Sequence, residues 1–147
     1  MNRESQLVLG AMVAVVLVLI GVKYAYEDIM AYMDKPNAEE AKQGEQAIGD
    51  MQQLAEAHDP MDLIASVAPC TPGRQLREAC VTVTPGWGQA SNRQQIAADL
   101  WKGWAEICTH RGLAEQPADC RIELRSPSGE TIGGSGDDDG SRIWVKE

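Results

Sequence analysis

The longest hydrophobic run in the chain, residues 7–22, contains no Asp, Glu, Lys or Arg. Its 16 residues correspond to about 24 Å of helix at roughly 1.5 Å per residue, whereas a bilayer core is about 30 Å thick. Tyr24 and Tyr26 extend the run because tyrosine favours the membrane–water boundary, and the aliphatic stem of Lys23 can snorkel. The pattern therefore predicts a single transmembrane helix over residues 7–26.

Two other interpretations of this run are a cleaved signal peptide and a buried core helix. Residues 21–24 offer no suitable pair of small residues for signal cleavage, and the run has no polar stripe of the kind that marks a core helix. Within it, Gly10 and Ala14 are one helical turn apart and form a small-xxx-small pair. Such a pair lets another membrane helix approach closely, so both residues are candidate partner-binding positions.

The segment after the hydrophobic run has helical character and few apolar residues. A helix is expected to begin at Asn37, which can form a capping box with Glu40, and to run to His58. A short helical turn is expected to continue through Val67. The narrow apolar stripe of the longer helix either packs on the chain's own domain or forms a seam with a partner helix. The pattern predicts a helical stalk over residues 27–68.

The last half of the chain alternates strands with one helix. A helix starting near Ser91 places apolar residues at helical spacing and is expected to end at Gly112. Four short segments have strand character: residues 80–84, 121–125, 131–132 and 141–145. The sequence therefore predicts a small α+β domain over residues 69–147, in which one long helix packs on a short, mostly antiparallel sheet.

Composition and charge narrow the function. The chain has 147 residues and a net charge of −9, and because Arg3 and Glu4 cancel, the excess negative charge follows the hydrophobic run. An acidic domain repels phosphate backbones, so nucleic-acid binding is excluded as a leading function. A domain of this size buries only a small core and often needs covalent bracing.

Four cysteines follow the hydrophobic run, and three states are open to them: disulfides, a zinc site or free thiols. Their spacings lack the closely spaced pairs of a zinc site, and an even count in a small domain favours disulfides. Disulfides place the domain outside the cytoplasm. We therefore expect a single-pass protein of the plasma (inner) membrane with a cytoplasmic tail, residues 1–6, and a periplasmic or extracytoplasmic domain.

Side-chain direction selects one of the three possible pairings. Cys120 shares strand parity with the apolar residues that follow it, and Cys108 lies on the apolar face of the helix, so these two meet between helix and sheet. Cys80 faces away from the core, where Cys70 in the preceding loop is its natural partner. The predicted disulfides are Cys70–Cys80 and Cys108–Cys120.

Other candidate chemistry is weak. Residues 136–140 form an acidic loop, but an EF-hand register would put Lys146 where the bidentate acid belongs, so only a weak calcium site of another type remains open. Trp87, in a Pro-Gly-Trp-Gly loop, and Trp144, with parity opposite to its apolar neighbours, are candidate partner anchors. No nucleophile has a plausible base, no phosphate loop is present, and no cofactor or metal is expected.

These features favour a non-catalytic accessory or structural subunit of a membrane protein complex. Its expected partners are other membrane protein subunits and the lipid bilayer, which residues 7–26 would contact. One alternative is a pilin-like or secretion-apparatus component that assembles through its N-terminal helix. Another is a membrane-anchored ligand-binding module that uses the Trp87 loop.

Overall fold

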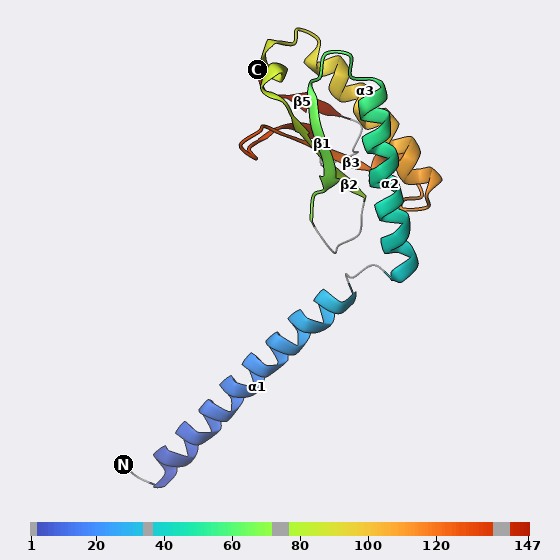
Figure 1. Ribbon diagram of the computed structural model, residues 1–147. Coiled ribbons are helices and arrows are strands. Elements are labelled where there is room, and N and C mark those ends of the chain that lie inside the picture. Colours follow the sequence, from blue (N-terminus) through green and yellow to red (C-terminus); the bar gives the residue numbers. More distant parts are fainter. Residues whose placement is uncertain (1–2, 34–36, 72–76, 137–141) are drawn as a thin grey trace. The chain divides into compact units, whose positions relative to one another are not determined.

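The computed structural model describes residues 3–33, 37–71, 77–136 and 142–147, and for residues 3–12 and 31–33 it describes only the backbone. The chain divides into two compact units, Met1–Lys35 and Pro36–Glu147 (Figure 1). The first contains helix α1. Within its described residues, the second contains two α-helices, two short 3₁₀ helices and a five-stranded sheet.

Helix α1 spans Arg3–Met33, so the expected helix is present, but the prediction that it crosses a membrane was wrong. Among the residues that the structure describes, no helix combines the length and the apolar character that crossing a membrane requires. Three charged residues follow the hydrophobic run within its next six positions: Lys23, Glu27 and Asp28.

Helix α2, Ala38–Ala57, begins with the predicted capping box. The Asn37 side chain accepts a hydrogen bond from the backbone N–H of Glu40 at 2.8 Å, and the Glu40 carboxylate accepts one from Asn37 N–H at 3.1 Å. Four buried residues at helical spacing form one face of α2: Gly44, Ala47, Met51 and Ala55. Of the two alternatives for its apolar stripe, packing on the chain's own domain is the one observed.

Among the described residues the sheet contains five strands in the order β1-β2-β3-β4-β5, and of these neighbouring pairs only β2–β3 is parallel. The strands are β1 Ile64–Pro69, β2 Glu78–Val83, β3 Arg121–Arg125, β4 Thr131–Ser135 and β5 Ile143–Val145. The helical turn predicted through Val67 was wrong, because this segment forms β1. The Asp59 carboxylate accepts hydrogen bonds from the backbone N–H groups of Leu63 and Ile64, both at 2.8 Å, and so organises the turn between α2 and β1.

Helix α3, Arg93–His110, lies in the connection between the parallel strands β2 and β3, flanked by short 3₁₀ helices at Pro85–Gln89 and Pro117–Asp119. It ends at His110, and Gly112 follows two residues later with a φ of +71°, which suits the glycine predicted to end this helix. Both α2 and α3 contact the sheet, so the expectation of one helix on the sheet is corrected to two (Figure 1).

The core lies between these helices and one face of the sheet. The strand register places a row of residues side by side on this inner face: Val67, Val81, Leu124, Gly133 and Val145. Gly133 is required in this row, because a Cβ there would lie 2.8 Å from the Trp144 carbonyl oxygen and 2.9 Å from Leu124 Cδ1. The neighbouring row lies on the face turned away from the helices and contains Ala68, Cys80, Glu123, Gly134 and Trp144.

Candidate functional site

Two disulfides brace the domain, and their pairing is the one predicted. Cys70–Cys80 joins the end of β1 to β2, with the two Cα atoms 4.9 Å apart. Cys108–Cys120 joins α3 to the residue before β3, with a Cα separation of 6.3 Å. Each bond therefore links neighbouring segments of the domain and limits their relative movement.

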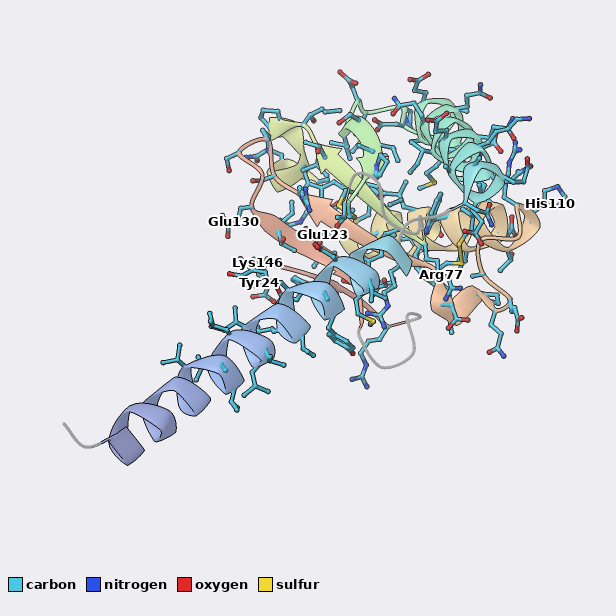
Figure 2. All side chains as sticks on the ribbon, turned by 90° about the horizontal axis from the view of Figure 1, so that it is seen from below. Tyr24, Arg77, His110, Glu123, Glu130 and Lys146 are labelled. Carbon is cyan, nitrogen blue, oxygen red and sulfur yellow. A yellow bond between two sulfur atoms is a disulfide. The ribbon has the colours of Figure 1, made fainter. Side chains whose placement is uncertain are left out.

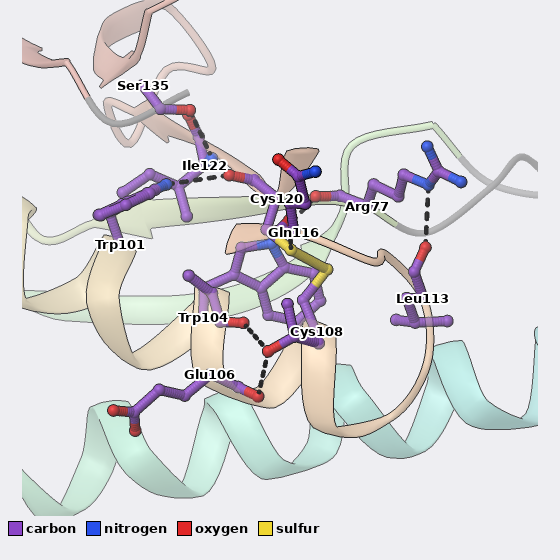
Figure 3. The surroundings of a disulfide bond; sticks show 12 residues. Arg77, Trp101, Trp104, Glu106, Cys108, Leu113, Gln116, Cys120, Ile122 and Ser135 are labelled. Atoms are coloured by element: carbon purple, nitrogen blue, oxygen red, sulfur yellow. Dashed lines mark hydrogen bonds between the residues drawn. A yellow bond between two sulfur atoms is a disulfide. The ribbon is translucent and has the colours of Figure 1, made fainter. Parts of the chain in front are cut away.

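Two tryptophans of α3 surround the Cys108–Cys120 disulfide (Figure 3). Trp101 Nε1 donates a hydrogen bond to the Cys120 carbonyl oxygen at 2.9 Å, and Trp104 Nε1 donates one to the Arg77 carbonyl oxygen at 3.0 Å. The Trp104 side chain is fully buried. These indoles therefore fix α3 on the sheet and are structural.

Trp87 does not form the exposed anchor that the sequence suggested. Residues 85–89 form a 3₁₀ helix in place of a projecting loop, and Trp87 is only 4% exposed within the core. Its Nε1 is buried and has no acceptor among the described residues. The prediction of an exposed Trp87 was wrong because the small neighbouring residues allow the chain to wind tightly and turn the indole inward.

Trp144 is the most exposed of the tryptophans, as its strand parity predicts. It lies on β5 in the outer row of the sheet and is 41% exposed. Next to it in this row is Gly134, where a Cβ would lie 2.7 Å from the Ile122 carbonyl oxygen. The glycine leaves a hollow of about 190 Å³ on the outer face, lined in part by Trp144, Arg121 and Glu123.

A cluster of polar side chains beside this hollow is centred on Glu123. Its Oε1 accepts hydrogen bonds from Arg125 Nε at 2.8 Å and from Thr131 Oγ1 at 2.9 Å. Partial burial raises the pKa of Glu123, but these two bonds and the Arg125 charge outweigh it, so the pKa of this carboxyl is lowered overall. The sequence reasoning missed this cluster, although the alternation that faces Ile122 and Leu124 inward also places Glu123 outward.

A second ion pair lies nearby, where Lys146 Nζ and Glu130 Oε1 are 2.7 Å apart (Figure 2). The hydrogen bond and the charge of Lys146 lower the pKa of the exposed Glu130. Together with Trp144, the Glu123 cluster and this pair give the outer face one aromatic side chain among fixed charges. Such a surface is suited to recognition, with the aromatic ring supplying contact area.

Helix α1 presents a different surface. Its large aliphatic side chains from Val13 to Val22 are between 46% and 63% exposed, and Ala14 is exposed among them. Gly10, the other member of the small-residue pair, lies outside the residues whose surroundings are described. The partner role of both remains a prediction.

The described residues do not form a set of metal ligands at either candidate location. The acidic residues at 137–139 of the predicted loop lie outside the described residues. Elsewhere, the ligand atoms of Cys70, Cys80 and Glu123 lie within 4.8 Å of one another, but both sulfurs belong to a disulfide and are not free thiolates.

No protein-family model, curated protein or solved structure matches this chain.

Proposed function

We propose that the chain is a non-catalytic accessory subunit of a membrane protein complex, and that its disulfide-braced domain works on the extracytoplasmic side. The observation that carries this proposal is the exposed apolar surface of α1, formed by residues 13–22. In this role, α1 packs against apolar helices of partner subunits.

Burial of the apolar surface of α1 would stabilise such an assembly. A helix that is apolar on all sides is stable in water only when other apolar groups cover it. Fully burying one Val, Leu or Ile side chain stabilises by about 1.5–3 kcal/mol, so even partial coverage of this segment supplies a large driving force for assembly. Because Leu17 and Leu19 are both 63% exposed, they are strong candidates for the contact.

Two features of the domain support its location and its role. The domain contains two disulfides. Disulfides persist in oxidising compartments and are rare in the cytoplasm. The outer sheet face carries Trp144 among charged groups, which suits a second contact with a partner of the same complex. The domain thus has its core braced internally and its recognition groups on the surface.

Purification of the full chain in a mild detergent tests the proposal. We expect stoichiometric co-purification with other membrane proteins, and loss of these partners from a Leu17→Asn variant. A Glu27→Gln variant, altered on the same helix outside the apolar segment, serves as the matched control. A monomer that purifies without partners would contradict the proposal, and filaments of this chain alone would favour the pilin-like alternative.

A further inference from the structure

A cavity of about 460 Å³ lies between α2, the first half of α3 and the loop that leads into β1. Most of its wall is apolar, with Leu54 from α2, Ile96 and Leu100 from α3, and Leu63 from the loop. Met61 also lines it and is 57% exposed, which leaves a flexible apolar side chain accessible to a ligand. Pockets for small molecules commonly measure roughly 300–1,000 Å³ and have mainly apolar walls.

Leu54 and Gly103 lie close together in the wall of the cavity. A Cβ at position 103 would lie 3.0 Å from both Leu54 methyl carbons, which is tighter than ordinary packing. Glycine therefore lets Leu54 lie directly against the backbone of α3. A larger residue at position 103 would displace the Leu54 side chain and change the shape of the cavity.

Two of the four polar side chains that line the cavity are acidic. Asp59 and Asp99 line it together with the neutral Asn92 and with His58, and no Lys or Arg is among its lining residues in the described structure. The Asp59 carboxylate is held in place by its bonds to the N–H groups of Leu63 and Ile64. Asp99 extends from α3 and accepts a hydrogen bond from Gln95 Nε2 at 2.9 Å. An anion would therefore meet two carboxylates here, whereas a cation would be attracted.

We propose that this cavity binds a small amphiphile with an apolar chain and a cationic head. The chain would contact the Leu54, Ile96 and Leu100 side chains, and the head would lie near the Asp59 and Asp99 carboxylates. This binding does not depend on the proposed role as a complex subunit, because the cavity is formed by α2, α3, the α2–β1 loop and the start of β1, and no residue of α1 lines it.

Titration of the full chain with decyltrimethylammonium and with decyl sulfate tests the proposal, using methyl NMR shifts at concentrations below micelle formation. These probes share an apolar chain and differ in the charge of the head. We expect saturable shifts of the Leu54, Ile96 and Leu100 methyl groups with the cation, and affinity at least about tenfold weaker for the anion, equivalent to about 1.4 kcal/mol. Val15 and Leu17 report separately on binding to α1.

Three variants distinguish binding in the cavity from nonspecific attraction of the cationic probe to an acidic protein. Asp99→Asn should weaken binding of the cation by about threefold or more, whereas Asp119→Asn removes the same charge elsewhere and should change it less than about twofold. Gly103→Leu should abolish the cavity shifts while the rest of the spectrum is retained. Equal affinity for both probes, equal effects of the two Asp variants, or shifts confined to α1 would overturn the proposal.

Discussion

The Gln52 side-chain oxygen accepts a hydrogen bond from the backbone N–H of Val67 at 2.8 Å, which connects α2 to the edge strand β1. An unpaired edge donor is a template for pairing with another chain. Two residues further along β1, Pro69 has no N–H to offer. At the opposite edge, Gln94 Nε2 donates to the Ile143 carbonyl oxygen at 2.7 Å. Helix side chains thus cover backbone groups at both edges of the sheet.

Replacement of Gln52 by Leu is expected to destabilise the domain by about 1–2 kcal/mol, because it leaves the part-buried Val67 N–H without its acceptor. Urea denaturation measures the loss, and analytical ultracentrifugation measures the increased self-association that an uncovered edge permits. Glu56→Ala is the control, since it removes only the exposed bond between Gln52 and Glu56. Equal effects of the two substitutions would show that the contact with β1 does not matter.

The local parts of the fold could be predicted from the sequence, and the long-range parts could not. The capping box at Asn37, the strand parity of Cys120 and the glycine end of α3 depend on neighbouring residues, and all three predictions are confirmed. Strand β1 was missed because it is stabilised by pairing with β2 and by the bond from Gln52, which lies 15 residues away.

In the candidate sites too, the local features could be predicted from the sequence and the long-range ones could not. Exposure of Trp144 follows from alternation along one strand. Burial of Trp87 depends on how a 3₁₀ helix is placed against the core, and local composition suggested the opposite. In the wall of the α2–α3 cavity, Gly103 lies close to Leu54 from a different helix, a relationship that no spacing in the sequence indicates.

Removing the two disulfides should have unequal effects. Both close loops of similar length, with sequence separations of 10 and 12, so the chain-entropy contribution is about 3 kcal/mol for each. Cys108 and Cys120 are both fully buried, so their double replacement by Ala also leaves a cavity. We expect this double variant to be at least about 1 kcal/mol less stable in urea than Cys70→Ala/Cys80→Ala. The reverse order would contradict this assignment of the core.

Two buried tryptophans should respond differently to replacement by Phe. Trp104→Phe removes a hydrogen bond to the Arg77 carbonyl oxygen, whereas Trp87→Phe removes a buried N–H that has no acceptor in the described part of the chain. Both substitutions lose similar apolar volume, so the free energy of unfolding should fall by about 1–3 kcal/mol more for Trp104→Phe. Thermal and urea denaturation of the two variants give this difference, and equal losses would mean that the Trp104 hydrogen bond contributes nothing.

Glu123 should make the stability of the domain depend on pH. Its folded-state pKa is lowered below the ordinary value of 4.5, so its charged form stabilises the fold above that pH, and this contribution is lost as the pH falls through the lowered pKa. Because the pair with Arg125 is about one third exposed, solvent screening limits the contribution to roughly 0.5–1 kcal/mol. Glu123→Gln should therefore be less stable than the unmodified chain at pH 7, and the difference should shrink steadily below about pH 4.5.

Urea denaturation from pH 7 to pH 3 measures this difference in stability, with Glu130→Gln as the control for an exposed ion pair that salt should screen. A difference between Glu123→Gln and the unmodified chain that stays constant with pH would show that the Glu123 carboxylate acts through shape alone and that its charge is not used.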